Sequence, residues 1–244
     1  MKKKLFAAVV SLVVATVMLT SASFAWFTVS TAPEVTSIEV TMEATKNLEI
    51  AKATDNETPP TEVAVGDAGN ETKWGAVVSE FTGATLNFPA KMDGTTLKTI
   101  SYGTDGRVAA LDATITISPE LSSGAGSITK DITNGPTGAK VAAVYGVWLR
   151  SNVTQTVTAT VDSTGLTVTP AATWATGKTN ANAIQVAVSD GSTIGNEISL
   201  TANIEKLVYI IVYMDGDAVI AKSVPADLTI SGIKVTFTGS AMGA

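Results

Sequence analysis

Carboxylates are almost the only side chains in this sequence that could do acid-base or metal chemistry. The chain has no histidine and no cysteine, so it lacks the usual general base near neutral pH, the thiol nucleophile and the commonest zinc ligands. A glycosidase would need only two facing carboxylates about 5 to 10 Å apart, but most of the acidic candidates fall at turns or outward positions. Those candidates are Asp112, Glu120, Glu197 and Glu205. We therefore expect a protein that is not an enzyme and has no catalytic residue.

One acidic cluster deserves weighing as a metal site. Asp215-Gly216-Asp217 could offer carboxylate oxygens to calcium. The cluster lacks the further acidic positions of an EF-hand loop, and a tight hairpin explains it fully. We expect no metal site and no cofactor.

Aromatic side chains form the third candidate chemistry. A sugar-binding platform could be built from Trp74, Trp148, Trp174 and Tyr102. Aromatic content is only 6%, and scattered aromatics in a sandwich are more often part of its core. We therefore keep a monomeric surface adhesin or carbohydrate-binding module only as the alternative to the main functional prediction.

The elements that must position these residues are predicted to be strands. Apolar residues alternate with threonine or another polar residue, which is the period of a strand with one buried face and one wet face. Three segments show this pattern, with predicted inward residues Ile38, Val40 and Met42, then Ala113, Ile115 and Ile117, then Val157, Ala159 and Val161.

Two longer segments, residues 141–149 and 207–213, are almost continuously apolar. Such runs are typical of strands covered on both faces or of a subunit contact. We favour two central strands.

Glycine marks the predicted turns. Four Asp-Gly dipeptides should close tight hairpins, because glycine accepts positive φ. A fifth glycine, Gly232, lies where the apolar parity of the last strand changes, which predicts a bulge that puts Leu228, Ile230, Ile233, Val235 and Phe237 on one face. The dipeptides are Asp93-Gly94, Asp105-Gly106, Asp190-Gly191 and Asp215-Gly216.

The predicted fold is all-β: an antiparallel, jelly-roll-like β-sandwich with long loop insertions at residues 53–72 and 122–138. Residues 37–244 are long enough for one such domain. With no disulfide available, stability must come from the core or from neighbouring subunits.

Residues 1–25 are predicted to be a signal peptide. Lys2, Lys3 and Lys4 precede an apolar core at residues 5–19, and small residues then lead to Ala25. We expect signal peptidase to cut between Ala25 and Trp26, with a cut after Ala22 as second choice and an uncleaved anchor as the alternative. The chain would meet the membrane only as its precursor and would then be secreted to the extracellular matrix or cell surface.

Net charge argues against a nucleic-acid partner. The chain has 16 basic and 22 acidic residues, and loss of residues 1–25 removes three lysines and no acid, which leaves 13 and 22 and a net charge of −9. Such a chain repels phosphates and anionic membrane surfaces.

The segment Ala22-Ser23-Phe24-Ala25-Trp26-Phe27, with the threonine-rich strand that follows, resembles the exported TasA and camelysin group of Gram-positive bacteria. The likeness covers roughly the first 40 residues. It implies a jelly-roll subunit of an extracellular biofilm fibre, a homopolymer in which the freed N-terminal segment of one subunit completes the sheet of the next. An accessory anchor protein is a further candidate partner. The metalloprotease activity described for camelysin-like proteins is not carried over, because this chain has no histidine.

The same mechanism has a physical basis in the sequence. A freed N-terminus would leave Trp26 and Phe27 in water, and adding a strand to a neighbour's sheet would bury them and satisfy backbone hydrogen bonds. Head-to-tail contacts that do not close make filaments. Residues 26–36 are the candidate donor strand, whereas for residues 38–42 we favour the first strand of the chain's own sandwich. The side chains proposed for exchange are Trp26, Phe27, Val29, Val35 and Ile38.

Overall fold

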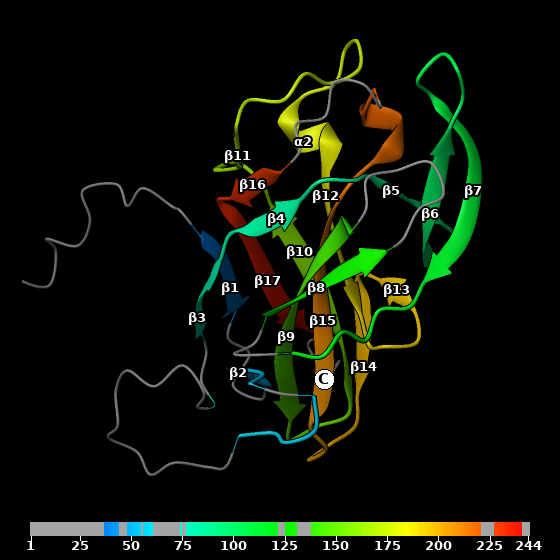
Figure 1. The fold of residues 1–244 in the computed structure, drawn as a ribbon. Coiled ribbons are helices and arrows are strands. Elements are labelled where there is room, and N and C mark those ends of the chain that lie inside the picture. The colour runs from blue at the N-terminus through cyan, green and yellow to red at the C-terminus, as the bar shows by residue number, and fades with distance from the viewer. Residues whose placement is uncertain are drawn as a thin grey trace, which may run out of the picture. The chain divides into compact units, whose positions relative to one another are not determined.

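In the part of the chain that the structure describes, nearly all regular structure is β-strand (Figure 1). The computed structural model describes residues 37–43, 48–54, 56–60, 74, 77–121, 125–130, 138–220 and 227–240, which all belong to the unit Val35–Ala244. The predicted signal peptide, the Ala25-Trp26 cleavage site and the exchange residues Phe27, Val29 and Val35 lie outside the described residues. No helix in the described part is long and apolar enough to cross a membrane.

The described strands form four sheets. The five-stranded sheet has the order β14 (Glu197–Leu200), β10 (Gln155–Asp162), β17 (Ile233–Gly239), β1 (Ser37–Glu43), β3 (Val77–Thr82). The central sheet has the order β13 (Ile194–Gly195), β12 (Ile184–Ser189), β15 (Lys206–Met214), β9 (Ala139–Ser151), β2 (Leu48–Lys52), and β8 (Ala125–Lys130) also pairs with β9. The short sheet is β11 (Thr167–Thr169), β16 (Leu228–Ser231), β4 (Ala84–Leu86), and the hairpin sheet is β5 (Ala90–Asp93), β6 (Thr96–Tyr102), β7 (Val108–Ile115).

The prediction of an all-β fold with antiparallel sheets is confirmed. Among the described strands, all ladders are antiparallel except the one between β1 and β17, which is parallel. Helical structure in the described part is limited to α2 (Asn180–Ala183) and the 3-10 turn η1 (Gly216–Ala218). The jelly-roll order of strands stays a prediction.

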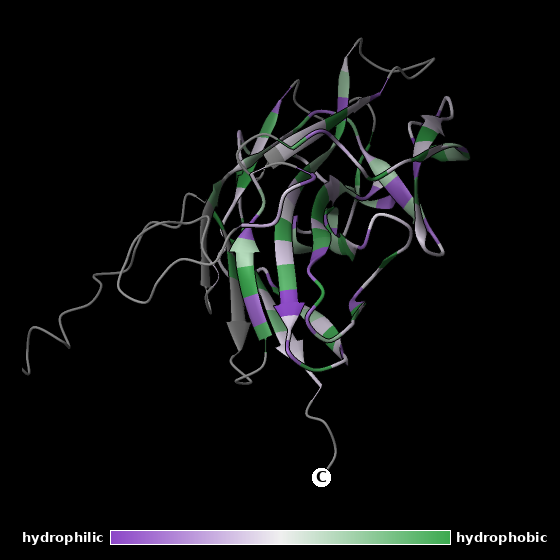
Figure 2. Cartoon of the chain, turned by 90° about the horizontal axis from the view of Figure 1, so that it is seen from below, coloured by the Kyte–Doolittle hydropathy of each residue, from purple (hydrophilic) through white to green (hydrophobic). Residues whose placement is uncertain are grey.

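The central sheet is buried on both faces, which explains the two continuous apolar runs. They form β9 and β15, which pair with each other over residues 142–149 and 206–213. Alternate residues of β15 enter two different cores: Val208 and Ile210 the first, Tyr209 and Ile211 the second. The prediction of two central strands is confirmed. Figure 2 shows, along several strands of the molecule, hydrophobic bands that alternate with more hydrophilic ones.

The two cores are closed by different sheets. The five-stranded and short sheets supply the other side of the first core, including Phe237, Val235 and Ile230. The hairpin sheet supplies the second core with residues such as Leu97, Ile100 and Ile115. Burying one such aliphatic side chain stabilises the fold by about 1.5 to 3 kcal/mol, so each sheet is held by its own apolar face.

Three of the four Asp-Gly turns are confirmed. The dipeptide at 93–94 joins β5 to β6, that at 105–106 joins β6 to β7, and that at 190–191 joins β12 to β13. Their glycines have φ values of 60°, 75° and 91°.

The fourth turn prediction is wrong. Asp215 is the N-cap of η1 rather than the start of a hairpin, and β15 pairs with β12 and β9 instead of with residues 218–221. Gly216 is required for a different reason, because a Cβ there would lie 2.6 Å from Cδ1 of Ile100.

Gly232 breaks the last strand in two. Its φ is 75°, and the residues on either side belong to β16 in the short sheet and β17 in the five-stranded sheet. A simple bulge in one strand is therefore the wrong description. The five apolar residues predicted to share a face do enter one core, the first.

Other local predictions need correction. Ala113 and Val161 are exposed instead of inward-facing, because β7 is open on most of its length and β10 passes beyond the core at its end. The insertion at 122–138 contains a strand, β8, since its backbone pairs with β9. The loop after β2 is partly buried, at Ala53, while residues 61–73 lie outside the described residues.

Candidate functional site: the first strand and the sheet edges

The first strand, β1, is an internal strand of the five-stranded sheet. It lies between β17, to which it runs parallel, and β3, to which it runs antiparallel. The register places Ile38 beside Ile233 of β17 and Phe81 of β3. Both backbone edges of β1 are thus paired within the chain's own sheet.

The side chains of Ile38 and Val40 are fully buried in the first core. Their burial contributes about 1.5 to 3 kcal/mol each. Ile38, one of the proposed exchange residues, therefore belongs to the chain's own core when the chain is alone. Sequence periodicity was sufficient to predict this burial, but it gave no sign of the parallel neighbour.

The amino end of β1 lies at the junction of two sheets. Because β1 and β17 are parallel, Ser37 and Ile38 lie beside the start of β17, which follows Gly232. The backbones are close there, since a Cβ on Gly232 would lie 2.0 Å from the carbonyl oxygen of Gly165. The backbones of Gly165 and Gly232 thus pack closely where the short sheet meets the five-stranded sheet.

The acidic candidates for glycoside hydrolysis are not gathered at one site. Asp112 lies on β7, Glu120 before β8, Glu197 on β14 and Glu205 before β15, and all four are exposed. The sequence did not indicate that Glu57 lies near Glu120. Both residues, together with Asn56, line a hollow of about 510 Å³. Both glutamates are exposed to solvent.

The carboxylates of the Asp215-Gly216-Asp217 cluster are engaged in local interactions. The backbone N–H of Asp217 donates to Oδ1 of Asp215 over 3.2 Å, which caps η1. Nζ of Lys91 lies 2.5 Å from Oδ2 of Asp217. Within the described residues no group of three or more acidic, histidine or cysteine side chains is placed to hold a metal ion.

The four aromatic candidates pack in different places. Trp148 is buried in the second core, and Tyr102 packs against that core. Trp174 packs against the first core, and its Nε1 donates a hydrogen bond to Oδ1 of Asn180 over 2.7 Å. Trp74 lies under the guanidinium of Arg150, 4.4 Å from its ring centre. They do not form a single sugar-stacking platform.

Two polar atoms of this aromatic set are buried without a hydrogen-bond partner in the described part: the hydroxyl of Tyr102 and Nε1 of Trp148. Burial raises the pKa of Tyr102 above its ordinary value of 10, and the nearby Asp215 and Asp217 raise it further. The hydroxyl is therefore a neutral group at physiological pH.

An ion pair and several hydrogen bonds meet at the carboxylate of Asp190, in the β12–β13 turn. Oδ2 of Asp190 lies 3.0 Å from Nζ of Lys206, and its Oδ1 accepts from Ser192 and Thr193. Burial alone would raise the pKa of Asp190, but these hydrogen bonds outweigh it and hold the pKa well below 3.8. The pair joins β13 and its turn to the start of β15.

Edge strands are the remaining candidate surface. Within the part of the chain that the structure describes, β7 pairs with β6 alone, and residues 109–114 are all exposed. An unpaired strand edge offers a row of backbone N–H and C=O groups to another strand. In the five-stranded sheet, the strand at one edge, β14, is only four residues long.

No protein-family model matches this chain, and no curated protein or solved structure matches it either. The resemblance to the TasA and camelysin group thus rests on the residues around Ala25 and stays a prediction.

Proposed function

We propose that this chain is a structural subunit of an extracellular filament or biofilm matrix, and that copies assemble by strand addition. Residues 1–25 act as the signal peptide, residues 26–36 as the added strand, and residues 37–244 as the sandwich domain that carries it. The partners are further copies of the same chain, with signal peptidase acting during export.

The observation that carries the proposal is the position of β1. The strand that directly follows the proposed donor segment has both backbone edges paired, with β17 and with β3. The donor segment is thus attached to a fixed strand whose Ile38 and Val40 are anchored in the core. A short apolar segment on such an anchor can bury its side chains and satisfy its backbone hydrogen bonds by pairing with the edge of another copy.

The fold supports the same proposal in a second way. Its sheets are mostly antiparallel, and at β7 the described chain leaves an edge uncovered. Strand addition needs both a donor that is extended and an acceptor with free backbone groups. A sandwich of this kind provides the acceptor without unfolding.

Deletion of residues 26–34, with residues 1–25 kept for export, tests the proposal. We expect the secreted variant to be a folded monomer by circular dichroism and light scattering, whereas the parent chain forms fibres visible by electron microscopy. A chain of unchanged length with Thr28→Ser and Thr31→Ser is the matched control and should form fibres normally.

Two results would count against the proposal. Fibres at normal yield from the deletion variant would eliminate the N-terminal strand as donor. A parent chain that stays monomeric at high concentration, with its N-terminus confirmed as Trp26 by sequencing, would eliminate the filament role itself.

A further inference from the structure

The outer edge of β7 is the most exposed strand edge in the described part of the molecule. From Ala109 to Thr114 every residue is exposed, and only Ile115 at its end is buried. The strand carries a single charged side chain, Asp112, and its largest apolar side chain, Leu111, is 38% exposed. Soluble proteins usually protect such an edge with lysine, proline or a cover. The sequence of β7 contains no lysine or proline, and no described strand pairs with its outer edge.

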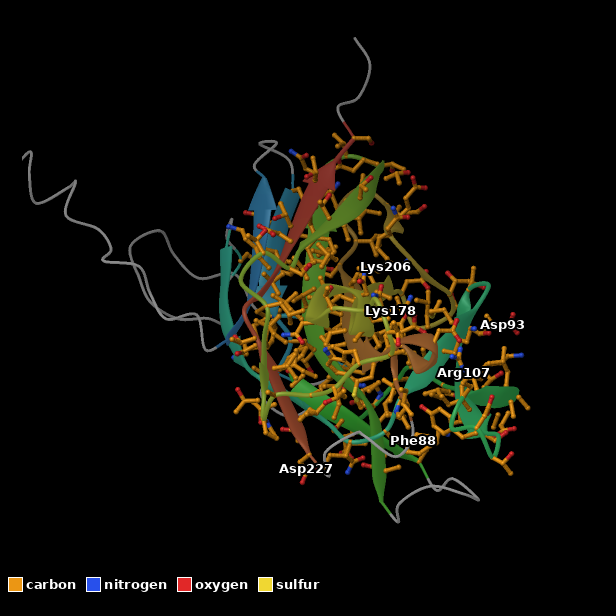
Figure 3. All side chains as sticks on the ribbon, turned by 90° about the horizontal axis from the view of Figure 1, so that it is seen from above. Phe88, Asp93, Arg107, Lys178, Lys206 and Asp227 are labelled. Carbon is orange, nitrogen blue, oxygen red and sulfur yellow. The ribbon has the colours of Figure 1, made fainter. Side chains whose placement is uncertain are left out.

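This edge lies on the opposite side of the fold from β1. Figure 1 shows β1 and β3 at one side and β7 at the other, and the view in Figure 3 shows the same separation, with Arg107 near the β6–β7 turn. A segment attached to β1 of one copy and bound to β7 of another would join two different surfaces. Such a contact is head-to-tail and leaves a free donor and a free acceptor at the two ends.

We propose that β7 is the acceptor edge for residues 26–32 of a second copy, an inference that rests on the proposed function. The lengths agree. Pro33 has no N–H to donate, so an added strand should end at Ala32. Residues 26–32 are seven residues and β7 is eight, so an added strand would span β7 from Val108 to Thr114 and leave out only the buried Ile115.

The side chains of the two segments are compatible. Residues 26–32 contain no charged side chain, and the α-ammonium group that cleavage creates on Trp26 would lie at the Val108 end of β7, so no side chain of the segment is placed beside Asp112 at an electrostatic cost. Across the strands, Phe27 would lie beside Ala109 and Val29 beside Leu111, and each would cover the exposed methyl groups of its neighbour. Cross-strand apolar pairs of this kind are the usual source of stability in a sheet.

A hollow at the start of β7 sets the direction of the added strand. It has a volume of about 390 Å³. Its apolar lining includes Val108, Val219 and Ile220, and its charged lining is Arg107 with Asp105 and Asp217. The hollow at the other end, near Thr114, is about 150 Å³. We place the indole of Trp26 in the larger hollow, where Arg107 offers a cation to its ring. The added strand then runs parallel to β7.

Two lysines on the edge provide the first test. Ala109→Lys with Leu111→Lys should leave the fold intact, because both positions are exposed, but should block strand addition. We expect fibre yield to fall at least tenfold in the secreted chain. Ile204→Lys is the matched control, since Ile204 is an exposed apolar residue (55%) away from β7, and it should form fibres normally. Normal fibres from a folded double-lysine variant would overturn the assignment of β7 while leaving the proposed function intact.

A mixing experiment separates donor from acceptor. The deletion variant lacking residues 26–34 keeps an intact β7, and the double-lysine variant keeps an intact donor. Neither should polymerise alone, but together they should form a one-to-one dimer that grows no further, as measured by size-exclusion chromatography with light scattering. Absence of the dimer, with both variants folded, would overturn the assignment. A parent chain that forms no fibres would instead reject the proposed function.

Cysteine cross-linking tests the direction of the strand. The natural chain has no cysteine, so a disulfide can arise only from introduced residues. Thr28→Cys with Ala110→Cys should give covalent oligomers under oxidising conditions, because parallel pairing of residue 26 with 108 places 28 beside 110. Thr28→Cys with Glu197→Cys, on β14, is the control. Equal cross-linking of the two variants would overturn the parallel placement on β7.

Discussion

A Cβ atom on Gly146 would lie 2.2 Å from Cδ1 of Leu121. Gly146 is in the middle of β9, and the side chain of Leu121 fills the space above it in the second core. Ala53 approaches the same point, with its Cβ 2.9 Å from the position of the added atom. This glycine is needed for close packing between a central strand and the segment before β8, because any side chain would displace both neighbours.

Gly146→Ala should therefore destabilise the fold by about 1 to 3 kcal/mol, the usual cost of an overpacked core. Urea unfolding followed by circular dichroism measures the change. Gly195→Ala is the matched control, because the nearest atom to its Cβ would be 4.0 Å away, and it should change stability by less than about 0.5 kcal/mol. In a Leu121→Ala background the cost of Gly146→Ala should shrink. An unchanged cost in that background would show that Leu121 is not the obstacle.

Periodicity was enough to predict the strands that form the centre of the molecule. The continuous apolar run of β15 indicated a strand with two covered faces, and its residues do divide between two cores. Turn chemistry was equally informative at Gly94, Gly106 and Gly191, because positive φ is a local property that glycine alone meets easily.

Long-range pairing could not be predicted in the same way. Nothing in the residues of β1 reveals that the last strand, β17, lies parallel beside it, since the two segments carry the same alternating pattern as antiparallel strands. The wrong prediction of a hairpin at Asp215 has a similar cause. An Asp-Gly dipeptide also suits a helix N-cap. In this fold the segment contacts Lys91 and Ile100, which are distant in sequence. The proposed donor residues around Trp26 lie outside the described residues, so they stay a prediction.

Asn56 ties the loop after β2 to the segment before β8, and it gives a second prediction. Its Oδ1 accepts from the backbone N–H of Leu121 over 2.8 Å, and its Nδ2 donates to the carbonyl oxygen of Pro119 over 2.7 Å. Asn56→Ala should cost about 1 to 3 kcal/mol, because it leaves partly buried backbone groups unpaired.

Hydrogen exchange gives the direct measurement for Asn56→Ala. The amide of Leu121 should exchange faster in the variant, while amides of β15 change only as far as global stability falls. Asn152→Ala, at an exposed position, is the control and should leave the exchange of Leu121 unaltered. Unchanged protection at Leu121 in the Asn56 variant would contradict the assigned hydrogen bond.

Acid should weaken the fold through Asp190. Its folded pKa lies well below the ordinary value of 3.8, so the charged carboxylate stabilises the native state. That contribution is complete above the unfolded pKa and is lost as the pH falls through about 4 towards the folded pKa. Asp190→Asn should therefore flatten the acid side of the stability profile, measured by urea unfolding from pH 2 to 7.

The companion variant Lys206→Met separates the ion pair from the turn. It removes the ammonium but keeps the hydrogen bonds from Ser192 and Thr193 to Asp190, so the acid dependence should shrink without disappearing. A profile for Asp190→Asn that matches the parent chain at every pH would show that this carboxyl does not contribute to acid sensitivity.

Alkali should unfold the protein and ionise its tyrosines together. The chain has four tyrosines, and burial raises the pKa of every one, to about 12 for Tyr213. Since each folded pKa exceeds the unfolded value, the neutral phenols stabilise the fold below about pH 10, and that contribution is lost as the pH rises through the folded values. We expect phenolate absorbance at 295 nm to stay low in the native protein at pH 10.5 and then to rise in the same step as the loss of β-sheet circular dichroism. Tyr213→Phe should reduce the amplitude of that step and move its midpoint to higher pH. A gradual ionisation of all four phenols around pH 10, with circular dichroism unchanged, would contradict the burial of Tyr145, Tyr209 and Tyr213 in the central sheet and the packing of Tyr102, on β6, against the second core.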